Sequence, residues 1–243
     1  MRYLILADIH SNLVAFKAVL DDVDSKGGFD KIWCLGDVVG YGPQPHECIE
    51  LLCRYNHICV AGNHDWAAVN QIDTSDFNSD AANANHWTAR QLTGEDVDYL
   101  QYLPPSLCEN DFTLSHGSPR EPIWEYILSA GTAADNFDVF LTPFCLIGHS
   151  HIPVIFESFE NDVFHQEFSD NSALTLGKNR LIINPGSVGQ PRDNDPRASY
   201  ALYDSEAKII YHHRIQYDIL ITQERMRQVG LPEFLISRLS HGR

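Results

Sequence analysis

Two histidines, His149 and His151, stand two residues apart directly after a short apolar run in the segment CLIGHSHIP (145–153). An apolar run bounded by glycine is typical of a strand buried on both faces, so we expect both imidazoles in the loop at its carboxyl end. Open α/β sheets bind their ligands at that edge. Two solvated loop histidines would give the same pattern, so the interpretation depends on partners from other strands.

Four further apolar runs end in side chains that offer oxygen or imidazole nitrogen. LILADIH ends in Asp8 and His10, WCLGD in Asp37, CVAGNHD in Asn63, His64 and Asp65, and TLSHG in His116. In any one run the acid or amide could be a helix cap and the histidine a turn residue. Because five runs share the feature, we predict that their ends meet at one edge of one sheet.

Carboxylates, an asparagine carbonyl and neutral imidazoles form a mixed oxygen and nitrogen ligand set. Such a set suits Mn²⁺, Fe²⁺, Co²⁺, Ni²⁺ or Zn²⁺ better than Ca²⁺ or a metal that prefers thiolates. The side chains are too many for one ion, so we expect two divalent transition-metal ions about 3.5–4 Å apart, bridged by a shared carboxylate. Two ions, two aspartates and a bridging hydroxide leave about one net positive charge, which would attract phosphate.

Composition limits the class of protein. The chain has 243 residues, 44% of them hydrophobic, which suffices for a packed core. Its 17 basic and 33 acidic residues give a net charge of −16, which argues against binding of a nucleic-acid polymer. The six cysteines show no C-x-x-C pair, so we expect buried free thiols and a cytoplasmic location. We find no signal peptide or membrane span in the sequence.

The strand ends need a scaffold, and the first half of the chain alternates apolar runs with amphipathic stretches. Helices are predicted over Leu13–Val23, Pro45–Arg54, Asp80–Gln91, Thr93–Tyr102 and Trp124–Phe137. This βαβ alternation is typical of a parallel sheet with covering helices. Thr93 and Asp96 have the spacing of a capping box. Short strands are predicted from Val154 to Gln216, and no linker divides the chain, so we expect residues 1–243 to form a single two-sheet domain.

The order D-x-H, G-D, G-N-H-D, H and G-H-x-H resembles the calcineurin-like metallophosphoesterase superfamily, and the match extends from Asp8 to His151. The segments GDVVGYGPQP, SHGSPREPIWEY and NPGSVGQPRD are similar to the small bacterial and archaeal phosphodiesterase branch, which includes diadenosine tetraphosphate hydrolases. The resemblance implies an α/β fold, a four-layer α-β-β-α sandwich of two mixed sheets flanked by helices.

The resemblance also implies the role of each ligand. The first ion would be held by Asp8, His10, Asp37 and His151, and the second by Asp37, Asn63, His116 and His149. Asp37 would then be the bridge, and the expected reaction is in-line attack on phosphorus by a metal-bridging hydroxide.

His64 is left over from ligation, and beside Asn63 it would protonate the leaving oxygen as a general acid. A structural role for this histidine is the alternative. Asp65 could hold the imidazole in one tautomer, or it could cap a helix.

Three residues near the motifs are candidates for contacts with a small phosphorylated substrate. Arg192 could grip a phosphate oxygen with two guanidinium nitrogens, as family members use this stretch beside the site, or it could be a plain surface arginine. Asn12 and Arg120 each follow a metal ligand by a few residues. Tyr41 and Trp124 could stack on a base or simply pack.

We therefore predict a dinuclear-metal phosphoric ester hydrolase that acts on small phosphodiesters or dinucleoside polyphosphates. A serine/threonine-type protein phosphatase would share every catalytic residue, although a short chain with few insertions favours small substrates. A non-catalytic scaffold of the same fold, similar to the retromer subunit, is the other alternative. Such relatives typically lack ligands or the motif histidine, whereas this chain has all of them.

Overall fold

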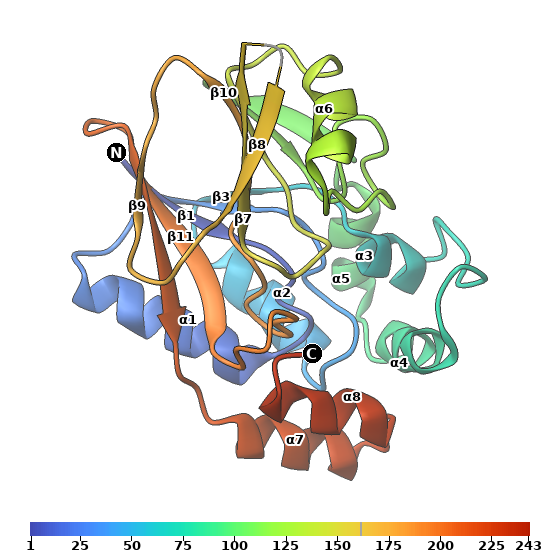
Figure 1. The fold of residues 1–243 in the computed structure, drawn as a ribbon. Helices are drawn as coiled ribbons and strands as arrows, with labels where there is room; N and C mark the ends of the chain where they lie inside the picture. Colours follow the sequence, from blue (N-terminus) through green and yellow to red (C-terminus); the bar gives the residue numbers. More distant parts are fainter. Residues whose placement is uncertain (161) are drawn as a thin grey trace.

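The computed structural model of the chain describes residues 1–160 and 162–243 and contains two mixed sheets (Figure 1). The first sheet is formed by β1 (Arg2–Leu6), β2 (Lys31–Cys34), β3 (His57–Cys59), β9 (Ala173–Thr175), β11 (Ala198–Asp204) and β12 (Ile209–Ile215). The second is formed by β4 (Ser106–Glu109), β5 (Phe112–Ser115), β6 (Phe144–Leu146), β7 (Val154–Phe159), β8 (Asp162–Glu167) and β10 (Arg180–Asn184). Their strand orders are β3-β2-β1-β11-β12-β9 and β4-β5-β6-β10-β7-β8.

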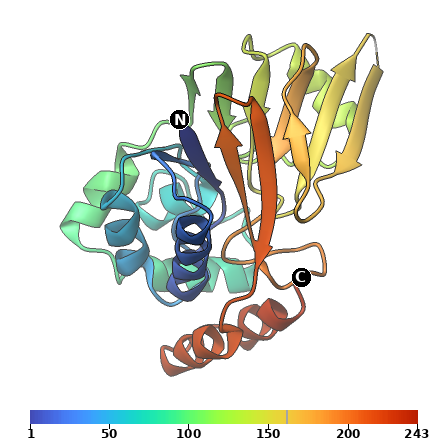
Figure 2. The ribbon, with the colours of Figure 1, turned by 90° about the vertical axis from the view of Figure 1, so that its left-hand side faces the viewer.

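Helices cover the outer faces of both sheets (Figure 2). The helices of the described residues are α1 (Leu13–Ser25), α2 (Pro45–Cys53), α3 (Asn63–Ala68), α4 (Ser79–Ala89), α5 (Gly94–Gln101), α6 (Ala130–Phe137), α7 (Ile219–Gln228) and α8 (Glu233–Ser237), followed by the 3-10 turn η1 (Arg238–Ser240). Of these, α7 and α8 lie below the sheets (Figure 1). Apolar residues of α1 and α2 pack on the first sheet, and those of α6 pack on the second. The predicted α/β sandwich of two mixed sheets between helices is confirmed.

The continuous apolar run of β1 is explained by its burial on both faces, because successive side chains of a strand point to opposite sides of the sheet. Tyr3 and Ile5 pack in the cluster between the two sheets. Leu4 and Leu6 pack on the other side, in the cluster that includes the buried face of α1.

The five motif strands belong to two sheets, so the prediction of a single sheet edge is wrong. β1, β2 and β3 run parallel in the first sheet, and β5 and β6 run parallel in the second. The side chains that follow these strands still meet, because the sheets stack with those carboxyl ends side by side.

Several local predictions can be compared with the structure. The capping box of Thr93 and Asp96 at the start of α5 is confirmed. The helix predicted over Trp124–Phe137 is too long, because the Ser129 side chain accepts a hydrogen bond from the Thr132 N–H and α6 begins only after this cap.

All six cysteines are free, but burial is confirmed for only four of them, since Cys53 and Cys108 are exposed. Within residues 1–160 and 162–243, no helix is long and apolar enough to span a membrane.

Candidate metal centre and substrate cavity

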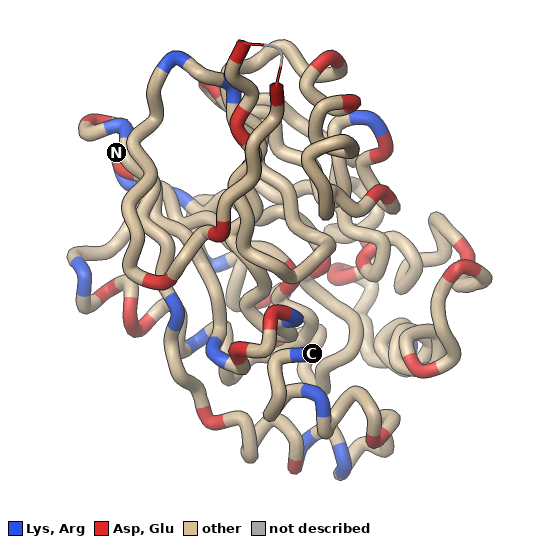
Figure 3. Tube along the Cα trace, viewed as in Figure 1, with Lys and Arg blue, Asp and Glu red and all other residues tan. Residues whose placement is uncertain are grey.

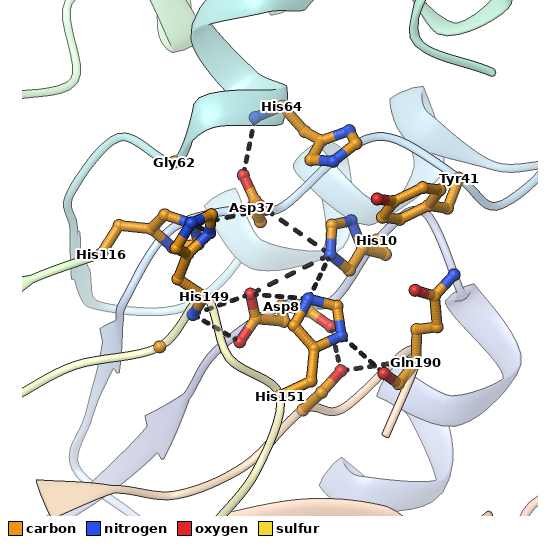
Figure 4. Close-up of polar contacts among 12 residues, drawn as sticks. Asp8, His10, Asp37, Tyr41, Gly62, His64, His116, His149, His151 and Gln190 are labelled. Carbon is orange, nitrogen blue, oxygen red and sulfur yellow. Dashed lines mark hydrogen bonds and ion pairs between the residues drawn. The ribbon is translucent and has the colours of Figure 1, made fainter. Parts of the chain in front are cut away.

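The loops after the motif strands bring together two groups of potential metal ligands (Figure 4). One group is Asp8, His10, Asp37 and His151, and the other is Asp37, His116 and His149. Within each group the ligand atoms lie within 4.8 Å of one another, and every member is buried. Asn63 lies beside the second group, with its Oδ1 3.1 Å from His116 Nε2. The structure therefore places all seven predicted ligands in one region.

The backbone at these loops adopts a left-handed conformation. Asp8, His10, Asp37, His149 and His151 have φ values of 54°, 49°, 53°, 64° and 60°. In this conformation Cβ crowds the following carbonyl of an L-residue, which costs about 1 kcal/mol or more per residue. The chain thus turns sharply at the positions that supply the ligands.

Four imidazoles are held in a defined orientation by main-chain carbonyls. The contacts are His10 Nδ1 with Val39 O at 3.0 Å, His116 Nδ1 with Leu35 O at 2.8 Å, His151 Nδ1 with Gln190 O at 2.5 Å and His149 Nε2 with Trp124 O at 3.1 Å. A neutral imidazole carries one N–H, and here that N–H donates to a carbonyl. In His10, His149 and His151, whose rings burial keeps neutral, the other nitrogen has a free lone pair, as in histidines that bind metals.

The remaining ring nitrogens face one another in two pairs. His10 Nε2 lies 3.1 Å from His151 Nε2, and His116 Nε2 lies 3.1 Å from His149 Nδ1. The rings of His10 and His151 have each committed their one hydrogen to a carbonyl, so two lone pairs point at each other and repel. In the second pair burial lowers the pKa of His116, but Asp37 raises it more, to about 9, so this ring holds a second proton. A cation would remove the repulsion in the first pair and replace the proton in the second, so the donor set fits two divalent ions.

Asp37 links the two pairs of imidazoles. Its Oδ2 lies 3.5 Å from His10 Nε2 and 3.3 Å from His116 Nε2. Its Oδ1 accepts a hydrogen bond of 2.9 Å from the backbone N–H of His64. Gly62 leaves the space for this carboxylate, because a Cβ at Gly62 would lie 2.0 Å from Asp37 Oδ1. One carboxylate therefore faces both pairs of imidazoles.

Burial sets the electrostatics of the site. Burial, together with a smaller effect of the neighbouring Asp37, raises the pKa of Asp8 to about 7. Burial also lowers the pKa of His10, His149 and His151 well below the usual value of a histidine, so these rings are neutral at pH 7. Neutral imidazoles and a poorly stabilised carboxylate are groups that a bound cation would stabilise.

His64 lies in the cavity wall beside the two ligand groups. Its ring packs against Tyr41, with centroids 4.3 Å apart, and against Phe77, with centroids 4.6 Å apart. Its Nδ1 is buried and has no hydrogen-bond partner among the described residues.

Asp65 acts as a helix cap. Its two oxygens accept hydrogen bonds from the Val39 N–H at 3.1 Å and from the Gly62 N–H at 3.0 Å, at the start of α3. Of the two roles left open for this residue, the structure supports capping, and among the described residues Asp65 makes no hydrogen bond to the His64 ring.

A cavity of about 90 Å³ opens above these groups. It is lined by Asp37, Tyr41, Asn63, His64, Asp76, Phe77, Asn78, Ala81, Trp124, Tyr126, His149, His151 and Arg192. The Arg192 guanidinium donates to Gln190 Oε1 at 2.8 Å and lies 3.4 Å from the Tyr41 hydroxyl. It forms no ion pair with any acid in the described part of the chain, so its charge is free to meet an anion.

Two predicted substrate contacts, Asn12 and Arg120, are not supported by the structure. Asn12 caps α1, because its Oδ1 accepts from the Ala15 N–H at 3.2 Å, and its amide donates to Gly189 O at 2.9 Å. Arg120 lies outside the cavity and pairs with Glu125 and with Asp135, the latter at 3.1 Å. Although Arg120 follows His116 by only four residues, its side chain does not reach the cavity.

Several cavity residues were not singled out in the sequence. Asp76, Phe77 and Asn78 come from the connection between α3 and α4, which contains no motif. Tyr126 stacks on His149 with ring centroids 3.9 Å apart. Gln190 was detectable only as part of the segment NPGSVGQPRD that carries Arg192.

Comparison with known proteins identifies the family. The family model described as the calcineurin-like phosphoesterase superfamily domain matches residues 1–208. The chain belongs to this superfamily. The crystal structure of a metallophosphoesterase from Sphaerobacter thermophilus is 48% identical in sequence, with a TM-score of 0.91 and coverage of 100% of this chain and 99% of that one. An uncharacterised protein of Methanocaldococcus jannaschii is 38% identical over 246 residues, which cover 98% of this chain and 97% of that protein.

Two further relatives show a more limited likeness to this phosphoesterase. The structure of a hypothetical protein from Pyrococcus horikoshii OT3 shares the fold, with 23% identity, a TM-score of 0.81 and coverage of 100% and 98%. A symmetrical bis(5'-nucleosyl)-tetraphosphatase of Pseudomonas putida is 33% identical over 79 residues, which cover 29% of this chain and 27% of that enzyme. Membership in the family and the likeness to the Sphaerobacter structure make the chain a metal-dependent phosphoesterase.

Proposed function

We propose that this phosphoesterase is a phosphodiesterase with a dinuclear metal centre, acting on small phosphodiesters or dinucleoside polyphosphates. The observation that carries the proposal is the pair of facing imidazole contacts joined by Asp37, beneath a cavity that Arg192 and His64 line. Two donor groups that share one carboxylate fit two ions, and a free cationic side chain fits an anionic substrate.

The assignment of residues to the two ions follows the two donor groups. We assign Asp8, His10, Asp37 and His151 to the first ion, and Asp37, Asn63, His116 and His149 to the second. Divalent ions such as Mn²⁺, Fe²⁺, Co²⁺, Ni²⁺ or Zn²⁺ supply Lewis acidity toward a phosphoryl oxygen and lower the pKa of water.

His64 is the group that we assign to proton transfer. Its ring is fixed by the packing of Tyr41 and Phe77, and it contributes no atom to either ligand group. Burial lowers the pKa of His64 to about 4. An anionic phosphate beside the ring favours the imidazolium, so the ring would take up a proton as substrate binds and return it to the leaving oxygen.

Arg192 is the group that we assign to substrate binding. It lines the same cavity as His64 and keeps its charge free of carboxylates among the residues described. A guanidinium can donate two parallel hydrogen bonds to the oxygens of one phosphoryl group.

The size of the cavity favours small substrates. A volume of about 90 Å³ admits a phosphoryl group and the first atoms of its ester arms. The 79-residue similarity to a bis(5'-nucleosyl)-tetraphosphatase supports dinucleoside polyphosphates as one candidate class. The free cysteines support our expectation of a cytoplasmic location, where thiols stay reduced.

A hydrolysis screen tests the proposal. The purified protein, loaded with Mn²⁺, is assayed with bis-p-nitrophenyl phosphate, p-nitrophenyl phosphate, cyclic nucleotides and diadenosine polyphosphates. We expect a higher kcat/KM for the diesters or the dinucleoside polyphosphates than for the monoester, and elemental analysis should give about two ions per chain. A clear preference for the monoester, or saturation at one ion, would contradict the corresponding part of the proposal.

A further inference from the structure

Asp76 is an acidic side chain that lines the substrate cavity without belonging to the candidate ligand set. Apart from Asp37, it is the one carboxylate among the described residues that line this cavity. The side chain is exposed. It makes no hydrogen bond or ion pair with the rest of the described chain, so its charge is not neutralised by a protein cation.

The neighbours of Asp76 fix its place at the cavity. The ring of the next residue, Phe77, packs on His64 and meets the edge of Trp124 with centroids 5.4 Å apart. Asn78 caps α4, because its Oδ1 accepts a hydrogen bond of 2.9 Å from the Ala81 N–H. With an anchored aromatic ring and a helix cap directly after it, Asp76 is held at the cavity and does not sit on a free loop.

The whole connection around Asp76 is acidic. Residues 70–80 contain Asp73, Asp76 and Asp80 and no lysine or arginine. The tube view shows acidic residues along this α3–α4 segment (Figure 3). The cavity thus has Arg192 as its basic side chain and an acidic connection in its wall.

We propose that Asp76 selects substrates by charge, so that monoanionic phosphodiesters are preferred over monoester dianions and over polyphosphates. The inference rests on the proposed function and narrows its substrate class to diesters with uncharged arms. Near neutral pH a diester carries one negative charge and a monoester about two, so a nearby carboxylate repels the monoester more strongly. Because Asp76 is exposed, water and salt screen its charge, and the discrimination should be about threefold to tenfold.

Two substrates with the same leaving group isolate this effect. We compare p-nitrophenyl phosphate, a dianion, with methyl p-nitrophenyl phosphate, a monoanion, in wild type and in Asp76→Asn, which keeps the size of the side chain. The variant should raise kcat/KM for the dianion about threefold to tenfold and change the value for the diester less than twofold. Turnover of diadenosine tetraphosphate should rise as well, and 0.5 M salt should shrink the difference.

Asp73→Asn is the matched control, because Asp73 lies on the same acidic connection but outside the cavity. It should leave the ratio of the two substrates unchanged. Inhibition by inorganic phosphate gives a second readout, since Asp76→Asn should bind this anion more tightly by a similar factor.

The outcomes separate this inference from the proposed function. Equal changes on both esters, or the same change in Asp73→Asn, would overturn the charge selection by Asp76. If the Mn²⁺-loaded wild type turns over neither ester nor any diadenosine polyphosphate, the proposed function fails, and this inference fails with it.

Discussion

His64 stands apart from the other histidines of the cavity because it belongs to neither ligand group and its ring is held by aromatic neighbours. We expect His64→Ala to keep its metal content yet to hydrolyse a diester with an alkoxide leaving group roughly 10²–10⁴-fold more slowly. Hydrolysis of a p-nitrophenyl diester should lose much less, because p-nitrophenolate leaves without a proton.

The comparison uses two phosphodiesters that differ only in the pKa of the leaving group. A structural role for His64 gives a different result, with equal losses on both substrates and reduced metal binding. That outcome would remove the general-acid assignment.

Asp37 is the side chain shared by the two proposed ion sites, since its Oδ2 faces His10 and His116 together. Asp37→Asn should therefore release both ions and abolish most turnover. Asp8→Asn is the control, because Asp8 belongs to the first group only and should weaken one ion more than the other. The bridge assignment is wrong if Asp37→Asn retains two ions per chain by elemental analysis and near-normal activity.

Single residues were predictable where a side chain that could bind a metal comes shortly after a buried strand. Asp8 and Asp37 come two and three residues after β1 and β2 end, so local pattern places them at the strand ends. The structure does not support the prediction for Arg120, because this residue pairs with Glu125 and Asp135 outside the cavity, and these ion pairs could not be read from the sequence. Asp76 was missed because only tertiary packing brings its loop to the cavity.

At the level of elements, the segment between β5 and α6 is held in place by Glu125. Its Oε2 accepts hydrogen bonds from Ser118 Oγ at 2.7 Å and from Asn136 Nδ2 at 2.8 Å, and its other oxygen pairs with Arg120. Directly before Glu125, the carbonyl oxygen of Trp124 accepts a hydrogen bond from Nε2 of the His149 ring. Glu125 thus acts on a candidate ligand through the backbone.

Glu125→Gln should weaken binding of the second ion about tenfold, at the low end of the range for residues that orient metal-binding histidines. The reason is that a loosened segment no longer fixes the Trp124 carbonyl against His149. Calorimetric titration of the chelator-treated protein with Mn²⁺ measures the effect. Asp135→Asn removes only an exposed contact of Arg120 and should bind both ions normally, so equal losses in the two variants would contradict this role.

Elements were predictable where they are long and amphipathic or buried on both faces, as for α1 and β1. The short strand β4 was missed, and β9 was covered only by the general prediction of short strands between Val154 and Gln216. β9 has three residues and is a strand only because it pairs with β12, more than thirty positions away in sequence. The carboxyl ends of the motif strands meet because the two sheets stack on each other. This stacking depends on contacts between residues far apart in the sequence, so the spacing of apolar residues within one strand or helix does not predict it.

For the molecule as a whole, the buried His212 makes stability depend on pH. It lies outside the metal centre, stacks on Phe168 and contacts Ser199 Oγ at 2.8 Å. Burial lowers its pKa to about 4, whereas an unfolded histidine titrates near 6.5. Between these values the unfolded chain binds a proton that the folded chain does not, so stability falls as pH falls.

Urea unfolding of wild type and His212→Gln at pH 7 and pH 5 checks this effect. Wild type should lose about 2 kcal/mol more than the variant over this interval, because the glutamine does not titrate. Other buried histidines contribute equally to both proteins and cancel in the comparison. An identical pH dependence in the two proteins would show that His212 carries no such effect.

The backbone is left-handed at five candidate ligands, and this conformation lowers the stability of the fold while it places the ligands. The five are Asp8, His10, Asp37, His149 and His151. At about 1 kcal/mol each, the five residues together destabilise the native state by roughly 5 kcal/mol, which is comparable to the whole stability of a small protein. Glycine would adopt the same conformation without this penalty but would offer no ligand. Selection for thermostability alone would therefore erase the site, and a stabilising mutation found at any of these positions would come at the expense of ion binding.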